Sequence, residues 1–401
     1  MFPSYSFHLP IRIEFGCGSS RKVGEIAKQM SWKKAFIVTD TGVRKAGLLN
    51  GVLESLESHK IPYYVFDGVQ PNPTDIMVEK AVEIFKEEGC DFIIAVGGGS
   101  SMDTGKGVAL LATNPGRIKD YEIRSMEDLI KGKIRNHIAP LITIPTTAGT
   151  GSEVDFWAVI TDTERKFKMC LGQAPPYPGG PYLGAIYALV DPLLTLTLPP
   201  SQTASTGFDA LIHAIETYTA RDSPPIVEAL ALQVIRLVAK YLPIAYADGS
   251  NIEARESMMY AAHIAGISMN LANCGLIHSL AEVLGGMYWN VPHGSALAVF
   301  APEVMEFNRL AVPEKFVKIA IAMGERVKGL SIREASRKAI DAVEKLINEL
   351  KLPKSLKELG VKEEDLPEIA RKAMETVEYE GNPRRASYED ILSIVRKCYK
   401  Q

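Results

Sequence analysis

Short apolar runs alternate with longer amphipathic segments through the first half of the chain. The runs that are typical of β-strands are Ile11–Phe15, Ala35–Thr39, Tyr63–Phe66, Phe92–Val96 and Leu141–Ile144. Helical patterns separate them at Ser20–Met30, Leu48–His59, Thr74–Glu88 and Ser101–Ala112. Further strands are expected at Phe156–Ile160, Lys166–Cys170 and Ile186–Val190. This alternation predicts an α/β fold in which helices cover both faces of a parallel sheet.

The pattern changes after residue 191. From Pro200 onward the apolar positions repeat with helical spacing, and no convincing strand is found. The expected helices are Thr206–Thr219, Pro225–Ala247, Glu253–Asn273, Leu276–Gly285, Pro313–Val327, Ile332–Leu350, Pro367–Val377 and Tyr388–Tyr399. Because a single core stops growing near ~250–300 residues, the length also favours two domains. We predict an α/β domain over residues 1–191 and an all-α domain over residues 192–401.

Composition excludes several classes of protein. Of the 401 residues 46% are hydrophobic, and 45 Lys and Arg against 48 Asp and Glu leave a formal charge of −3. The apolar fraction excludes a mainly disordered chain, and the lack of a basic excess argues against a nucleic-acid partner. No stretch approaches the roughly 20 apolar residues of a membrane span, so no membrane partner is expected. Five scattered cysteines without a CxxC pair are typical of reduced thiols and of a cytoplasmic protein.

A glycine-rich turn suggests a nucleotide site. The apolar run Phe92–Val96 leads directly into Gly97-Gly98-Gly99-Ser100-Ser101-Met102-Asp103, and a helical pattern follows. Backbone N–H groups at the start of a helix attract a pyrophosphate. The turn departs from the GxGxxG pattern at Met102, and it lacks the Ser or Thr of a Walker A loop. A tight turn that binds nothing is the alternative.

Two more segments support a nucleotide site. Asp40 directly follows the strand Ala35–Thr39, where a carboxylate can accept from a ribose 2′-OH and repel a 2′-phosphate; the alternative is a helix cap. The hydroxyl-rich segment Pro145–Glu153, which includes Thr146 and Thr147, follows another strand and offers neutral donors to a diphosphate. Because three such segments follow strands, we predict one crevice for a dinucleotide, with NAD favoured over NADP.

The helical half contains a candidate metal site. Asp209 and His213 are four residues apart in a helical pattern, which puts both side chains on one face. His278 and His293 offer two more imidazoles, and an Asp with three His fits Fe²⁺ or Zn²⁺ better than Mg²⁺ or Ca²⁺. For each histidine alone, a core or capping residue is the more common interpretation. Glu216 is interpreted as an exposed helix residue rather than as one that orients a ligand.

Four segments of the chain resemble the iron-containing (group III) alcohol dehydrogenase family, in that family's order. They are GGGSSMD, IPTTAGTGSEV, LPPSQTASTGFDALIHAIETY, and HSLAEVLGG with the following VPHG. The resemblance extends from the first strand to NPRRASYEDI, and it implies the family's two-domain fold. It implies the metal ligands Asp209, His213, His278 and His293. It implies a cofactor crevice lined by Gly97, Gly98, Gly99, Ser100, Asp103, Thr146 and Thr147. It further implies that Asp40 favours NAD and that the protein is a homo-oligomer, a dimer or larger.

The chain departs from the family pattern at three places. Many members carry a histidine one turn after the third ligand, where this chain has Glu282. We count Glu282 among the catalytic residues, with its role as proton relay, additional ligand or plain helix residue left open. One extra residue lies near Trp289–Asn290, and the loop Gln173–Gly184 is longer than usual for the family.

The resemblance implies an enzyme that interconverts primary alcohols and aldehydes. A metal, Fe²⁺ with Zn²⁺ as the alternative, would act as a Lewis acid on a small alcohol in the cleft between the domains. A nicotinamide cofactor would accept the hydride. A zinc-dependent polyol dehydrogenase of the glycerol type and a non-catalytic nucleotide and metal sensor are the alternatives.

Overall fold

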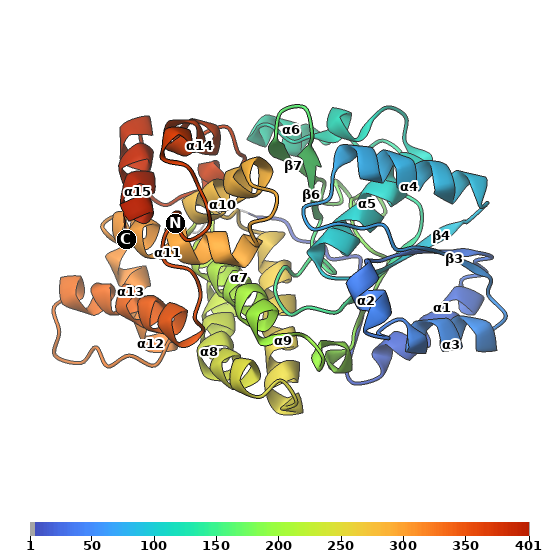
Figure 1. Ribbon diagram of the computed structural model, residues 1–401, viewed down its shortest axis with the longest axis horizontal. Helices are drawn as coiled ribbons and strands as arrows, with labels where there is room; N and C mark the ends of the chain where they lie inside the picture. Colours follow the sequence, from blue (N-terminus) through green and yellow to red (C-terminus); the bar gives the residue numbers. More distant parts are fainter. Residues whose placement is uncertain (1–4, 401) are drawn as a thin grey trace. The chain divides into compact units, whose positions relative to one another are not determined.

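The N-terminal half of the chain is built around a sheet of six parallel strands (Figure 1). The structure, a computed structural model, describes residues 5–400. In order across the sheet the strands are β1 (Arg12–Phe15), β8 (Tyr187–Val190), β5 (Leu141–Pro145), β4 (Phe92–Gly97), β2 (Ala35–Val38) and β3 (Tyr63–Phe66). The other two strands, β6 (Trp157–Asp162) and β7 (Phe167–Gly172), form an antiparallel pair of their own. Each strand lies within two residues of its predicted position, and the predicted α/β fold is confirmed.

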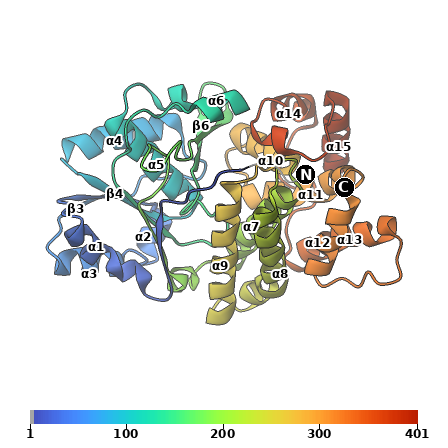
Figure 2. The same ribbon diagram turned by 180° about the vertical axis from the view of Figure 1, so that it is seen from behind.

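Helices cover both faces of the parallel sheet, as Figures 1 and 2 show. The helices of this half are α1 (Val23–Gln29), α2 (Thr41–Lys45), α3 (Asn50–Ser58), α4 (Asp75–Glu87), α5 (Gly99–Thr113) and α6 (Met126–Lys131). Ile37 and Ile94 point to the face covered by α1 and α3. Phe36 points to the opposite face, where its ring meets Phe85 of α4 edge-on at 5.6 Å. Because successive residues of a strand point to opposite faces, strands buried on both sides must be almost wholly apolar, as β2 and β4 are.

The C-terminal half is helical, and residues 199–400 contain no strand. Its helices are α7 (Pro200–Thr219), α8 (Pro225–Ala247), α9 (Ile252–Met269), α10 (Leu276–Met287), α11 (His293–Arg309), α12 (Pro313–Ala322), α13 (Ile332–Glu349), α14 (Leu366–Ala373) and α15 (Tyr388–Lys400). In Figure 1 α7, α8 and α9 pack side by side, and every residue of α7 from Gly207 to Thr219 is buried. Helices α8 and α12 begin with proline. The lack of an N–H costs nothing at this position, because the N–H of the first helical residue has no acceptor within the helix. Helices α9, α12 and α14 end about one turn earlier than predicted.

Helix α11 is the main element that the sequence analysis missed. It contains Pro302, which normally interrupts a helix, and Gly294 and Ser295 lie in its first turn. Its residues from Gly294 to Ala301 are all buried, so no polar stripe marks its periodicity. The short helices α2 and α6 were also not predicted.

The chain separates into two structural units at residues 198 and 199. The predicted boundary, after residue 191, lies slightly earlier. The turn Pro192–Thr195 stays with the sheet because Asp191 accepts hydrogen bonds from the Gly18 N–H (2.9 Å) and the Ser20 hydroxyl (2.6 Å). Ala148–Thr150 is grouped with the helical unit. No helix within residues 5–400 is both long enough and apolar enough to cross a membrane.

Candidate active site

Two helices of the C-terminal unit each carry a carboxylate and an imidazole one turn apart. Asp209 and His213 lie on α7, and His278 and Glu282 lie on α10; all four are buried. His293 is the first residue of α11. A Cβ on the next residue, Gly294, would stand 2.0 Å from a backbone carbonyl oxygen of α7, so the glycine allows the start of α11 to pack closely on α7. The helices therefore bring all five predicted side chains to one place.

Three imidazole nitrogens surround one carboxylate oxygen of Asp209. Oδ1 lies 3.5 Å from His278 Nε2, 3.6 Å from His213 Nδ1 and 3.7 Å from His293 Nε2. Two ligands bound at ~2.1 Å to one tetrahedral cation are separated by roughly 3.4 Å. The observed separations are close to this value and at or beyond the limit of a hydrogen bond. Donor atoms of Asp209, His278 and His293 all lie within 4.8 Å of one another, as ligands of one cation would, and His213 adds a nitrogen 3.6 Å from Asp209 Oδ1.

The hydrogen bonding of these side chains also fits a cation. Asp209 Oδ1, His213 Nδ1 and His278 Nε2 are buried and have no hydrogen-bond partner among the described residues. Such buried polar atoms are rare in folded proteins unless an ion or water satisfies them. Burial opposes ionisation of Asp209, but the three imidazoles hold its pKa well below the ordinary value. Burial lowers the pKa of His213 to about 3, so this imidazole is neutral and keeps a lone pair for a metal.

Glu216 orients one of the candidate ligands, which the sequence analysis did not expect. The prediction of an exposed helix residue is wrong, because Glu216 is buried and its Oε2 accepts from His278 Nδ1 at 2.5 Å. Its Oε1 accepts from the Ile277 N–H at 2.8 Å. A carboxylate bound to one ring nitrogen leaves the other, here Nε2, as the metal-facing atom. The i+3 and i+7 spacing from His213 and Asp209 was the available sequence signal.

Cys274 lies beside this site and was not identified from the sequence. Its sulfur and one nitrogen each of His213 and His278 lie within 4.8 Å of one another. Burial raises the pKa of Cys274 to about 11, so the thiol is neutral near pH 7. A lone cysteine in a sequence carries no spacing signal, and only the fold reveals this neighbourhood.

The predicted nucleotide segments meet at the carboxyl ends of β2, β4 and β5. Gly97 ends β4 with φ = +151°, and a Cβ there would lie 2.4 Å from the hydroxyl of Ser101 and 3.6 Å from Asp40 Oδ2. A Cβ on Gly98 would lie 3.4 Å from Thr147. The Thr146 N–H donates to the Gly97 carbonyl at 2.9 Å. Gly97 and Gly98, at the start of α5, therefore lie between the Asp40 and Thr147 segments.

The structure shows Asp40 as a helix cap, and its role toward a ribose stays a prediction. Its Oδ1 caps α2 by accepting from the Gly42 and Val43 N–H groups at 2.7 and 3.0 Å. Its Oδ2 faces Gly97. Near the same edge, the side-chain hydroxyls of Thr39, Ser101 and Thr147 are buried and have no hydrogen-bond partner among the described residues. Partly exposed Gly98, Gly99 and Ser100 begin the helix beside them. This arrangement suits a diphosphate and a ribose.

Both carboxylate oxygens of Asp103 accept hydrogen bonds from other protein groups, unlike the hydroxyls near the predicted crevice that have no such partner among the described residues. Its Oδ1 accepts from the Ser152 hydroxyl at 2.7 Å, and its Oδ2 accepts from the Val159 N–H at 3.0 Å. Ser152 in turn accepts from the buried ammonium of Lys106 at 2.9 Å. These bonds hold α5 to the segment that follows β5.

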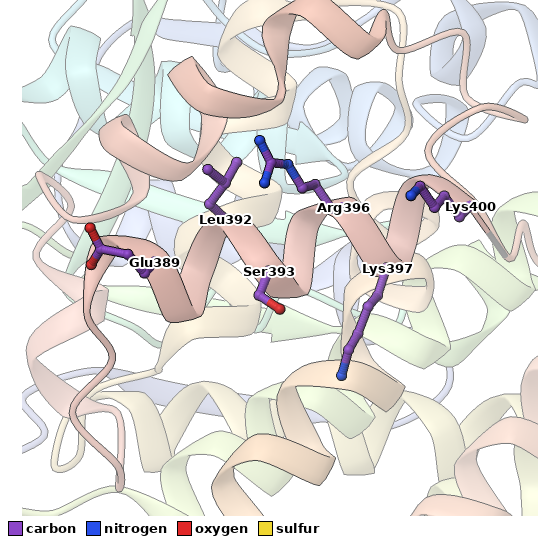
Figure 3. Close-up of a pocket in the computed structure, with 6 residues that line it drawn as sticks. All are labelled: Glu389, Leu392, Ser393, Arg396, Lys397 and Lys400. Atoms are coloured by element: carbon purple, nitrogen blue, oxygen red, sulfur yellow. The ribbon is translucent and has the colours of Figure 1, made fainter.

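A separate hollow of about 280 Å³ lies along α15 (Figure 3). It is lined by Glu389, Leu392, Ser393, Arg396, Lys397 and Lys400. The lining has no histidine or cysteine and includes none of the candidate site residues.

Known proteins share both halves of this architecture. The iron-containing alcohol dehydrogenase model matches residues 10–192, and the C-terminal model of the Fe-containing alcohol dehydrogenase family matches residues 203–399. The NAD-dependent methanol dehydrogenase of Bacillus methanolicus is 40% identical over 394 residues, which cover 98% of this chain and 99% of the relative. The 1,3-propanediol dehydrogenase of Klebsiella pneumoniae is 41% identical over 387 residues, 96% of each chain. The crystal structure of a 1,3-propanediol oxidoreductase matches with a TM-score of 0.91 and 40% identity over the full length of both chains. The chain therefore belongs to the iron-containing alcohol dehydrogenase family.

Proposed function

We propose that this protein interconverts primary alcohols and aldehydes, with NAD as the hydride carrier. The observation that carries the proposal is the buried Asp209 carboxylate oxygen with three imidazole nitrogens 3.5–3.7 Å away. Two relatives are named for methanol and for 1,3-propanediol, and both compounds are primary alcohols. Family membership makes this donor set the natural place for a catalytic metal.

The bound groups supply the central chemistry: the cation acts as a Lewis acid on the alcohol oxygen, and the nicotinamide takes up the hydride. Asp209, His213, His278 and His293 hold the cation. Glu216 keeps the proton of His278 on Nδ1, so that Nε2 faces the site. We propose Fe²⁺ as the metal; Zn²⁺ binds such ligands more tightly in general, so the metal recovered depends on how the protein is prepared.

The N-terminal unit would hold the cofactor through neutral groups. The helix start at Gly98 and the buried hydroxyls of Ser101 and Thr147, which have no hydrogen-bond partner among the described residues, would donate to the diphosphate. Asp40 Oδ2, which lies beside Gly97, would accept from a ribose hydroxyl and repel a 2′-phosphate, which would favour NAD. The family resemblance implies that substrate and nicotinamide would meet in a cleft between the domains.

A diol or polyol is the second candidate substrate, because one of the similar proteins is named for 1,3-propanediol. The test is anaerobic purification with metal analysis, reconstitution with Fe²⁺ or Zn²⁺, and assays of methanol, butanol, 1,3-propanediol, glycerol and the matching aldehydes with NAD and NADP. We expect metal-dependent turnover of primary alcohols, with NAD preferred. Asp209→Ala should remove both metal and activity, whereas the exposed-site control His137→Ala should retain both. Bound metal and bound NAD without turnover of any substrate would contradict the proposal and favour a sensor.

A further inference from the structure

Cys274 places a sulfur beside two of the candidate metal ligands. Its sulfur and one nitrogen each of His213 and His278 lie within 4.8 Å of one another. The two imidazole rings stack with their centroids 4.4 Å apart and their planes inclined by 17°, so the ring edges lie side by side. All three residues are more than nine-tenths buried, and His213 Nδ1 has no hydrogen-bond partner among the described residues. The three side chains therefore form a second set of donors within reach of one cation, and this set does not include Asp209.

The backbone at Cys274 is held in place at the start of α10. A Cβ on Gly381 would stand 2.1 Å from the Cys274 carbonyl oxygen, so this glycine allows a distant segment of the chain to pack directly on that peptide. Two residues later the Leu276 N–H donates to Asn382 Oδ1 at 3.1 Å. The sulfur is therefore attached to a backbone that has little freedom to move away from His278.

His278 cannot serve both donor sets at once. Its Nδ1 donates to Glu216 Oε2 at 2.5 Å, so Nε2 is the nitrogen of this ring that keeps a lone pair for a metal. The same Nε2 lies 3.5 Å from Asp209 Oδ1, in the set that we propose for the catalytic ion. An ion bound by Cys274 and His278 would therefore compete with the catalytic ion for this imidazole.

We propose that Cys274, His213 and His278 form a second, overlapping site for a thiophilic cation such as Cu⁺ or Cd²⁺, and that a cation bound there displaces the catalytic metal and inhibits the enzyme. Thiolate sulfur is a soft ligand that selects such cations, whereas the carboxylate and imidazoles around Asp209 also suit the harder Fe²⁺. As the bond from sulfur to metal forms, the S–H bond of the thiol breaks and its proton passes to the solvent, so the step needs no oxidant or reductant. The inhibition rests on the proposed function, whereas the binding of the cation does not.

The binding is tested by adding one equivalent of Cd²⁺ to the metal-free protein and recording the ultraviolet absorption. A thiolate bound to Cd²⁺ gives a sulfur-to-metal charge-transfer band, which imidazole and carboxylate ligands do not give. We expect this band in the wild type, and we expect Cys274→Ser to lose it and to bind Cd²⁺ at least about tenfold more weakly. Cys90→Ser is the matched control, because Cys90 is equally buried, at 8% exposed, and its sulfur donates to the Ala35 carbonyl in the N-terminal unit. Cys274→Ala should behave as Cys274→Ser does, and circular dichroism of each metal-free variant shows whether it is folded.

The inhibition is tested on the Fe²⁺-loaded enzyme under anaerobic conditions. Cd²⁺ should release Fe²⁺ from the wild type, as detected with a chromogenic chelator, and should stop alcohol oxidation. Cys274→Ser should require an at least about tenfold higher Cd²⁺ concentration for the same release and the same inhibition. Cys90→Ser should respond to Cd²⁺ as the wild type does.

The outcomes separate this proposal from the proposed function. Asp209→Ala should lose Fe²⁺ but keep the sulfur-to-cadmium band, because Asp209 is not a member of the sulfur set. A wild-type protein without the band, or a folded Cys274→Ser variant that keeps it, would overturn the Cys274 site and leave the proposed function intact. A band that Cys274→Ser removes, in a protein that binds no Fe²⁺ and oxidises no alcohol, would support the site but overturn its inhibitory role together with the proposed function.

Discussion

Lys106 is the charged residue whose replacement should destabilise the N-terminal unit most clearly. Its side chain is 0% exposed, and its ammonium donates to Asp155 Oδ1 at 2.5 Å, the Trp157 carbonyl at 2.6 Å and the Ser152 hydroxyl at 2.9 Å. Lys106→Met keeps the length of the side chain and removes the charge. The substitution leaves Asp155 buried without its cation, which costs about 3–5 kcal/mol. In a unit of this size that loss lowers Tm by on the order of 10 °C.

The loss of stability in Lys106→Met should depend on pH, because Asp155 changes its protonation. Burial raises the pKa of Asp155 to about 7, although Lys106 opposes the rise. Because this pKa exceeds that of the unfolded chain, the contribution of Asp155 to the stability of the wild type falls as pH rises from about 4 to 7 and then levels off. Without Lys106 the pKa of Asp155 rises further, so the variant continues to lose about 1.4 kcal/mol per pH unit above pH 7. The difference in the free energy of unfolding between Lys106→Met and the wild type should therefore grow with pH.

The measurement is urea or thermal unfolding of the full chain near pH 7 and near pH 8.5. The control is Lys131→Met. Lys131 pairs with Glu127 and its side chain is 70% exposed, so this substitution should lower the free energy of unfolding by less than about 1 kcal/mol. Adding Asp155→Asn to Lys106→Met should recover part of the stability and abolish the added pH dependence. A Lys106→Met variant as stable as the wild type, or equally destabilised at both pH values, would refute the reasoning.

Four further outcomes are expected. Asp209→Ala should weaken metal binding by at least about tenfold, as measured by equilibrium dialysis; unchanged binding would place the ion elsewhere. Cys274→Ser should retain the metal, because the neutral thiol is absent from the set around Asp209; loss of metal on this change would assign the sulfur as a ligand. Asp40→Ser keeps a cap for α2 but removes the charge, so the ratio of kcat/KM for NADP to that for NAD should rise about tenfold (~1.4 kcal/mol), and a constant ratio would contradict the role of Asp40. Gly97→Ala forces φ = +151° on a residue with a Cβ and should weaken NAD binding and lower Tm, whereas Gly89→Ala (φ = +61°, open surroundings) should lower Tm slightly and leave NAD binding unchanged.

Local pattern was sufficient to predict most of the fold. The strands could be located because apolar runs such as Phe92–Val96 are short, continuous and bounded by turn residues. Helix α11 could not, since burial on all sides removes the periodicity and Pro302 argues against a helix. The domain boundary differed because Asp191 ties the following turn to the sheet through contacts with residues more than 170 positions earlier.

The candidate site was predictable in its parts but not in its assembly. Spacing alone places Asp209 and His213 on one face of a helix. The packing of α10 and α11 against this face depends on tertiary structure, which residue spacing does not show. The same holds for the hydrogen bond between Glu216 and His278. Glu216 was misjudged because a helical glutamate is usually exposed; here its helix is buried on every side near the site.

The proposed metal would affect the stability of the helical unit as well as its chemistry. Pro200–Thr219 and Leu276–Met287 contain no Lys or Arg, yet these two helices bury Asp209, Glu216 and Glu282. Glu216 is satisfied by backbone N–H groups and by His278. Because burying a carboxylate is costly unless a positive charge compensates it, the divalent cation that we propose would also stabilise this core. Metal binding should therefore stabilise the helical unit, by about 4 kcal/mol when the free metal is a thousandfold above its Kd. The residues that we assign to catalysis would then also hold α7, α10 and α11 together.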